Sequence, residues 1–256
     1  MRRQAASALG NLGNASEAVI NALLLGLEDE DNLMRASAAQ ALGNLGNASE
    51  AVINALLLRL EDEDKSVRAK AASALGKLGN ASEAVISALV LRLEDGDNSV
   101  RSSAASALGN LGNASEAVIS ALVLLLEDGD NRVRSSAASA LGRLGNASET
   151  VINALLLRLE DGKGWVSREA AEALGNLGNV SEAVINALLL GLEDGEDWER
   201  SLAAEPLGNL GLKSSKVLPA VVQWIDRHQD TEYVGSGINV LWVLVAGEGN
   251  RSPVGF

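Results

Sequence analysis

The sequence contains no cysteine, a single histidine and very few aromatic residues. Without cysteine, disulfides and thiolate metal sites are excluded. The lone histidine, His228, cannot form a multi-histidine metal site, and no serine–histidine–aspartate constellation surrounds it in the sequence. Aromatic residues are 2% of the chain and hydrophobic residues 47%, so the core must consist of Ala, Leu, Val and Ile. We therefore predict no cofactor, no metal and no enzymatic activity.

The charge is strongly one-sided, with a net value of −13. An acidic surface repels phosphate groups, so neither nucleic acid nor an anionic membrane is an expected partner. No apolar run reaches the roughly 18 residues of a membrane span. The first residues, 1–5, lack the apolar region of a secretory signal. These features predict a soluble protein of the cytoplasm.

A six-residue string, Ala-Leu-Gly-x-Leu-Gly, returns along the chain at a constant interval of 33 residues. Its copies begin at Ala8, Ala41, Ala74, Ala107, Ala140 and Ala173. A seventh copy begins with Pro206 in place of Ala. A fixed period of this length is typical of repeat proteins, in which each unit buries its apolar face against its neighbours.

Each repeat is predicted to contain two helices. In residues 65–95, apolar residues at helical spacing end at Gly79, a residue that tolerates the positive φ of a helix C-terminus. Asn80 is predicted to cap the second helix, and Glu83 to complete a capping box. A broad apolar helix follows and ends at the acidic residues 94–97, which turn the chain back.

The run Asp97-Asn98-Ser99-Val100-Arg101, followed by Ala104-Ala105 and Ala107-Leu108-Gly109, resembles the HEAT repeat in its short bacterial, bilin-lyase-type form. The resemblance covers about residues 1–227. It implies an all-α fold, an α-solenoid with a right-handed superhelix of about seven 33-residue helical hairpins. It also implies a structural ladder of aspartate and arginine between successive repeats. By this resemblance, the ladder residues are Asp31, Arg35, Asp64, Arg68, Asp97, Arg101, Asp130 and Arg134.

Both ends of the chain depart from the pattern. Lys163 and Ser167 replace the ladder residues of one repeat, and Pro206 is expected to distort its helix. We therefore predict a repeat array over residues 1–211, with a truncated first repeat, and a degenerate C-terminal capping repeat and tail over 212–256. Because Arg2 aligns with Arg35, the chain begins inside a first helix. Either this is part of a longer protein, or self-association covers the uncapped N-terminal end.

Positions that differ between near-identical repeats are free to be adapted to a ligand. In HEAT-like solenoids the second helices line the concave face, so the resemblance implies a groove on these helices; the alternative is that the variable positions are simply solvated. The predicted partner-binding residues are Asn54, Arg59, Ser87, Arg92, Ser120, Asn153, Arg158 and Asn186. Trp165 and Trp198, at equivalent loop-to-helix positions, are interface candidates or part of a sealing cap.

The function predicted from these observations is a protein- or peptide-binding scaffold or adaptor, of the kind found as the sensing or docking part of larger bacterial proteins. The alternative that the resemblance implies is a subunit of a bilin (phycobilin) lyase-type protein that handles a chromophore. Such a protein needs a pocket for an open-chain tetrapyrrole. A third possibility is an amplified array with little evolved binding.

Overall fold

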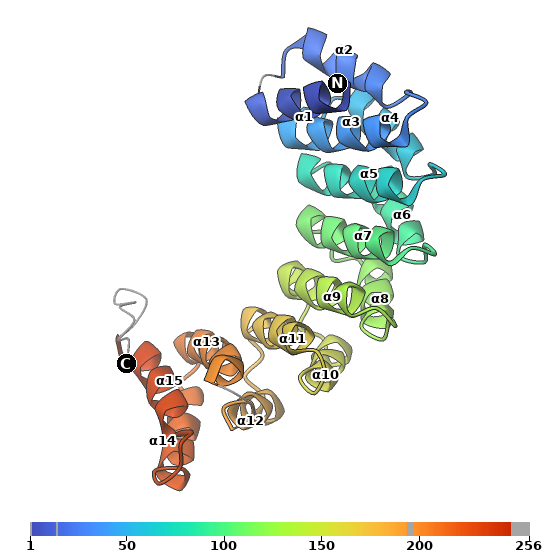
Figure 1. Cartoon of the computed structure of the whole chain (residues 1–256). Coiled ribbons are helices and arrows are strands. Elements are labelled where there is room, and N and C mark those ends of the chain that lie inside the picture. The colour runs from blue at the N-terminus through green and yellow to red at the C-terminus, as the bar shows by residue number, and fades with distance from the viewer. Residues whose placement is uncertain (1, 14, 194–196, 247–256) are drawn as a thin grey trace. The chain divides into compact units, whose positions relative to one another are not determined.

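The protein is entirely helical in the part of the chain that its computed structural model describes, residues 2–13, 15–193 and 197–246 (Figure 1). The side chains of residues 197–199, 201 and 246 fall outside this description. The chain divides into two compact units, residues 1–144 (unit 1) and 145–256 (unit 2). The predicted all-α solenoid class is confirmed.

The helices of unit 1 alternate between 14-residue and 10-residue lengths after the first. They are α1 (Arg2–Leu12), α2 (Glu17–Gly26), α3 (Asn32–Leu45), α4 (Glu50–Arg59), α5 (Lys65–Leu78), α6 (Glu83–Arg92), α7 (Asn98–Leu111), α8 (Glu116–Leu125) and α9 (Asn131–Leu144). Those of unit 2 are α10 (Glu149–Arg158), α11 (Gly164–Leu177), α12 (Glu182–Leu190), α13 (Asp197–Lys213), α14 (Val217–Arg227) and α15 (Val234–Ala246).

The odd-numbered helices α3, α5 and α7 begin at a capping aspartate and end at a glycine. In α5, the side chain of Asp64 accepts hydrogen bonds from the backbone N–H groups of Ser66 and Val67. These bonds satisfy two of the amide groups that a helix leaves unpaired at its N-terminus. At the other end, Gly79 adopts a left-handed conformation with φ of 70°. Glycine adopts this conformation without the steric cost that a Cβ atom adds.

The even-numbered helices begin differently from the prediction. The N-cap of α6 is Ser82, not Asn80, and its side chain makes no capping bond. The Oδ1 atom of Asn80 instead accepts the N–H of Ser82 at 3.0 Å, which fixes the turn just before the helix. The predicted capping box with Glu83 is therefore wrong, because the helix starts two residues later than the box requires.

The repeated Ala-Leu-Gly string packs one odd helix directly onto the next. A Cβ atom added to Gly76 would lie 2.6 Å from the Cα atom of Ala107, so only glycine permits this approach. Leu75, which precedes Gly76 in the string, is fully buried. The first glycine of each string thus serves helix packing, and the second ends the helix.

Helices joined by the acidic turn pack as antiparallel hairpins, whereas those joined by the Gly-Asn turn have few mutual contacts. In unit 1 the odd helices also form a tight row, visible in Figure 1, while consecutive even helices hardly touch. Small Gly and Ala side chains bring the odd helices together, and the even helices stand further apart. Neighbouring helices are therefore closer together in the odd row than in the even row.

Unit 2 keeps the same arrangement, with hairpins α10–α11, α12–α13 and α14–α15. Helix α13 continues through Pro206 to Lys213 and does not stop at Gly211. Gly211 is followed by Leu212 and lacks the asparagine that makes the turn elsewhere. The predicted domain boundary between residues 211 and 212 lies inside this helix.

Candidate functional site

One arginine in each of the odd helices α3, α5 and α7 links two acidic turns. Arg35 donates from Nε and Nη2 to the two carboxylate oxygens of Asp62, each at 2.8 Å. Its Nη1 donates to the carbonyl oxygens of Asp29 at 3.0 Å and Glu30 at 3.1 Å. The side chains of Arg35 and Asp62 are only 9% and 4% exposed. This two-pronged pairing has the geometry of the strongest charge-assisted hydrogen bonds.

The same contacts recur at the next repeats. Arg68 binds Asp95 through two hydrogen bonds of 2.9 Å, and Arg101 binds Asp128 at 2.7 and 2.9 Å. Arg134 donates to the carbonyl oxygen of Asp128 at 2.8 Å. The carboxylates that pair with arginine are thus the first aspartates of the acidic turns. Sequence reasoning had named the second ones.

The second aspartates of these turns have two other tasks. Besides capping its own helix, Asp64 accepts a hydrogen bond from Asn32 Nδ2 of the preceding repeat at 2.6 Å. Asp97 forms the corresponding contact with Lys65 Nζ at 3.0 Å. Asp130 accepts from Asn98. Asp31 caps α3 by accepting from the N–H of Leu33. The acidic turns therefore carry two parallel ladders, one through arginine and one through the helix caps.

The electrostatics of the ladders favour ionised carboxylates. Burial by itself would raise the pKa of Asp62, but hydrogen bonds from Arg35 and the Asp64 backbone N–H outweigh it and lower the pKa. The pKa of Asp97 falls to about 2, because Ser99 and Lys65 donate hydrogen bonds to it. Carboxylates held this way stabilise the fold in their ionised form.

The predicted partner-binding residues divide into two classes. The asparagine and serine members are exposed on the even helices: Asn54, Ser87 and Ser120 in unit 1, and Asn153 and Asn186 in unit 2. The arginine members are half-buried. Arg59 Nη1 donates to the carbonyl oxygen of Leu27 at 3.0 Å, and Arg92 Nη1 to that of Leu60 at 2.9 Å. Arg158 is also engaged in an interaction.

Arg59 therefore ties α4 to the end of α2, and Arg92 ties α6 to the end of α4. Replacing them by glutamate would remove bonds between repeats, so that substitution cannot separate binding from stability. The even helices also lie on the wider side of the stack in unit 1. That these helices line a concave groove stays a prediction.

The even helices expose a row of leucines that sequence reasoning missed. Leu25, Leu58, Leu91 and Leu124 of unit 1 are between 64% and 73% exposed. They occupy the same position in every repeat. Residues that are identical in all repeats were expected to serve the fold. These leucines are identical in the repeats of unit 1 and yet are not buried. The row lies among exposed glutamates such as Glu61 and Glu94.

The odd helices of unit 1 carry no acidic residue in any of the five segments. Their exposed positions include cations and amides, and several half-buried positions hold serines. The exposed cations that make no ion pair among the described residues include Lys70, Lys77 and Arg143. We call this surface the odd-helix face. In a chain of net charge −13, it is a local region of positive charge.

Two of these cations are positioned by amides of the preceding repeat. Lys77 Nζ donates to Asn44 Oδ1 at 2.8 Å, and Arg143 Nη1 donates to Asn110 Oδ1 at 2.9 Å. An amide oxygen orients the cation without neutralising it. The odd-helix face thus keeps its positive charge available to a ligand.

The four tryptophans lie in unit 2, with different degrees of burial. Trp165 is 53% exposed and Trp242 is 57% exposed. Trp224 is buried, donates from Nε1 to Glu193 Oε1 at 2.9 Å and stacks on His228 at a centroid distance of 4.3 Å. The side chain of Trp198 lies outside the described residues. Exposure keeps Trp165 available as a contact residue, whereas Trp224 belongs to the core.

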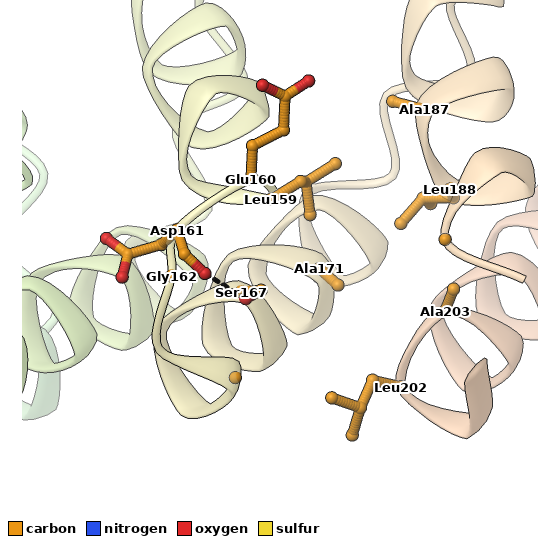
Figure 2. Close-up of a pocket in the computed structure, with 12 residues that line it drawn as sticks. Leu159, Glu160, Asp161, Gly162, Ser167, Ala171, Ala187, Leu188, Leu202 and Ala203 are labelled. Atoms are coloured by element: carbon orange, nitrogen blue, oxygen red, sulfur yellow. Dashed lines mark hydrogen bonds between the residues drawn. The ribbon is translucent and has the colours of Figure 1, made fainter. Parts of the chain in front are cut away.

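Unit 2 contains a cavity of about 330 Å³ among the α10–α11 turn and helices α11, α12 and α13 (Figure 2). Its lining is Leu159, Glu160, Asp161, Gly162, Gly164, Ser167, Ala171, Ala187, Leu188, Gly191, Leu202 and Ala203. Figure 2 shows Leu159 and Leu188 on opposite sides of the cavity, and the carboxylate of Asp161 directed away from Leu188. Ser167 Oγ donates to the carbonyl oxygen of Asp161 at 3.2 Å.

No group of three or more His, Cys, Asp or Glu side chains among the described residues has the arrangement of a metal site. None of the helices in that part of the chain combines the length and the apolar character needed to cross a bilayer.

A sequence model of HEAT repeats matches this chain in five overlapping windows, residues 1–57, 20–109, 53–142, 86–175 and 119–208. These windows cover most of the sequence. No curated protein matches the chain by sequence.

Several solved structures share the fold. A chain of the complex of CpcE and CpcF of phycocyanin lyase from Nostoc sp. PCC7120 is 25% identical, with a TM-score of 0.59, over 90% of this chain and 96% of that one. The Escherichia coli protein YibA is 22% identical, with a TM-score of 0.65, over 89% of this chain and 82% of that one. An engineered protein is 23% identical, with a TM-score of 0.56, over 96% and 75%.

Proposed function

This chain belongs to the HEAT repeat family, and from that premise we propose that it is a scaffold that binds a protein or peptide and has no enzymatic activity of its own. The observation that supports the proposal is the odd-helix face of unit 1. Five consecutive odd helices carry no carboxylate, while exposed cations lie on two of them, Lys70 and Lys77 on α5 and Arg143 on α9. A structural array needs no such separation of charge.

The chemistry of this face favours an acidic, extended segment as the partner. Positive charge without a paired carboxylate attracts acidic side chains and accelerates their encounter. Small serine side chains, including Ser73, Ser106 and Ser139, let a peptide backbone approach the helices and offer hydroxyl groups to it. The tight row of odd helices presents these groups at the regular interval of the repeat. We place this function in the cytoplasm, as a docking part of a larger assembly.

The test is direct binding of a fluorescein-labelled peptide of alternating glutamate and alanine, measured by anisotropy. We expect saturable binding that weakens as salt screens the charges. The triple variant Lys70→Glu, Lys77→Glu and Arg143→Glu should lower the affinity by about tenfold or more. Circular dichroism will show that the variant remains folded, because all three side chains are exposed.

The matched control reverses three exposed cations of unit 2, Lys163→Glu, Lys216→Glu and Arg227→Glu. It changes the net charge by the same amount. If the control weakens peptide binding as much as the odd-helix variant does, the binding follows total charge, and the assignment to this face is rejected.

A second candidate function rests on the likeness to the phycocyanin lyase complex, which covers nearly the whole of both chains. A bilin carries propionate carboxylates, which the cations of the odd-helix face would attract. This second function is tested by adding phycocyanobilin to the protein and recording the visible absorption spectrum. A stable shift of the absorption band, lost in the triple variant, supports chromophore handling; an unchanged spectrum rejects it.

A further inference from the structure

Two side chains that fill the inter-repeat space in unit 1 are replaced in unit 2. The position of Arg35 is occupied by Ser167, and the position of Arg59 by Gly191, each exactly four repeats later in the sequence. Both replacements line the cavity of unit 2. The cavity therefore lies where two arginine side chains lie in the regular repeat.

The arginines of unit 1 define what this space is built to hold. Arg35 donates to the carbonyl oxygens of Asp29 and Glu30, and Arg59 donates to that of Leu27. Three backbone carbonyl oxygens, at the end of α2 and in the turn that follows it, thus accept hydrogen bonds from guanidinium groups.

The corresponding carbonyls in unit 2 belong to Asp161, Gly162 and Leu159, and all three residues line the cavity. Ser167 Oγ supplies one donor, to Asp161, at 3.2 Å. Among the described residues, no donor reaches the carbonyl oxygens of Gly162 or Leu159. The acceptors of the guanidinium contact have been kept, while the arginines that used them are gone.

We propose that this cavity binds the guanidinium group of an arginine side chain from a partner polypeptide. The planar guanidinium carries five donors in a rigid fork, which suits several carbonyls at once better than the single point charge of lysine. The C-terminus of α10 adds the negative end of its helix dipole. Leu159, Leu188 and Leu202 provide apolar walls for the aliphatic stem.

The size of the cavity agrees with this ligand. A volume of about 330 Å³ lies at the lower end of small-molecule sites, which span about 300–1,000 Å³. An arginine side chain fits within this volume. The site is separate from the odd-helix face of unit 1 and prefers a ligand of the opposite charge, so it does not depend on the function proposed above.

The probe is acetyl-arginine methylamide, titrated into the whole chain and followed by amide NMR shifts. We expect one saturable site, with shifts concentrated at Gly162, Ser167 and Gly191. Acetyl-citrulline methylamide, which has nearly the same shape but no charge, should bind about tenfold more weakly or worse. Equal binding of the two compounds would overturn the proposal, because the site would then recognise shape alone.

The decisive variant is Ser167→Arg, which places a guanidinium in the cavity from within the chain. It should abolish binding of acetyl-arginine methylamide, whereas Ser215→Arg, which adds the same charge on an exposed turn of unit 2, should not. Binding that survives Ser167→Arg unchanged would place the ligand elsewhere and refute the assignment.

A neutral variant, Ser167→Met, covers the case in which the arginine disturbs folding. It fills the same space without charge and should also abolish binding, while tryptophan fluorescence reports whether unit 2 remains folded. Binding of the acidic peptide should be unchanged in Ser167→Arg and Ser167→Met. That readout separates failure of this site from failure of the odd-helix face.

Discussion

Units 1 and 2 share one repeat but use it differently. In unit 1 the arginine ladder is continuous from Arg35 to Arg101, and the odd helices carry no acidic residue. In unit 2 the ladder position holds Ser167, and the odd helices carry acidic residues such as Glu169 and Glu172. Every tryptophan and the single tyrosine also lie in unit 2. Unit 1 thus shows the repeat held by its ladders, and unit 2 shows what changes when a ladder residue is lost.

The comparison teaches that loss of a ladder arginine does more than lower stability. In unit 1 the space beside an acidic turn is occupied by arginine side chains such as Arg35 and Arg59, which bind the turn and the helix end before it. In unit 2 the backbone of the turn persists without them, because Asp161 still bonds to the N–H of Lys163 at 3.1 Å. The result is a cavity lined by the residues whose counterparts in unit 1 present carbonyl oxygens to the arginines. Degeneration of a repeat can therefore create a site that the regular repeat cannot have.

The distribution of aromatic residues lets the two units be measured separately. Unit 1 contains no Trp, Tyr or Phe, so intrinsic fluorescence reports unit 2 alone. Far-UV circular dichroism reports the helices of both units. Comparing the two signals in urea assigns each change in stability to one unit.

The largest effect is expected from breaking the ladder in unit 1. Arg35→Met removes the two hydrogen bonds that Arg35 donates to the buried carboxylate of Asp62, which should cost about 3 kcal/mol of unfolding free energy. The measurement is urea unfolding by circular dichroism. Ser167→Met makes the same final residue at the equivalent position of unit 2, where no buried carboxylate loses a ladder bond. A loss as large in Ser167→Met would show that the ladder does not explain the difference.

The close approach of odd helices should be the next most sensitive feature. Gly76→Ala places a Cβ atom 2.6 Å from the backbone of Ala107, so α7 must shift, at a cost of about 2 kcal/mol. In unit 2, Gly208→Ala meets Cγ1 of the Val243 side chain, which can rotate away, so the cost should be smaller. Gly96→Ala, where an added Cβ meets nothing within 4 Å, is the control. Equal stability of all three variants would contradict this account of the packing.

Acid should weaken unit 1 through its carboxylates. The pKa of Asp97 is lowered to about 2, so its ionised form stabilises the fold above the ordinary aspartate pKa of about 4. That contribution is lost as the pH falls from about 4 through about 2, because the unfolded chain then binds the proton more readily than the folded one. Urea midpoints measured by circular dichroism across this range should fall, and less steeply in Asp97→Asn. Parallel profiles for the two proteins would exclude Asp97 as a source of the pH dependence.

The smallest effect is expected at the exposed leucines. Leu91→Ala removes a side chain that is 64% exposed, so stability should change by less than about 0.5 kcal/mol. Leu89→Ala, two residues earlier and fully buried, should cost about 2–5 kcal/mol. A large loss from Leu91→Ala would mean that the leucine row is covered by other parts of the protein.

Much of the local structure follows from the sequence. The constant interval, the αL glycine at Gly79 and the absence of strand signals predict stacked helices without reference to coordinates. Their boundaries are set by short-range contacts, which the sequence displays directly. The start of α6 was misassigned because Asn80 and Ser82 both suit an N-cap chemically, and only the backbone shows which residue begins the helix.

By itself, the sequence determined the helical repeat, its interval and the identity of the packing residues, because these depend on neighbours within one turn or one period. Tertiary structure decided which aspartate each arginine reaches, since both aspartates of an acidic turn have suitable chemistry and only the displacement between repeats selects Asp62 for Arg35. It also decided which row of helices is the tight one, and that Ser167 and Gly191 meet at one cavity. These outcomes depend on distances between residues far apart in the chain, which a one-dimensional pattern does not contain.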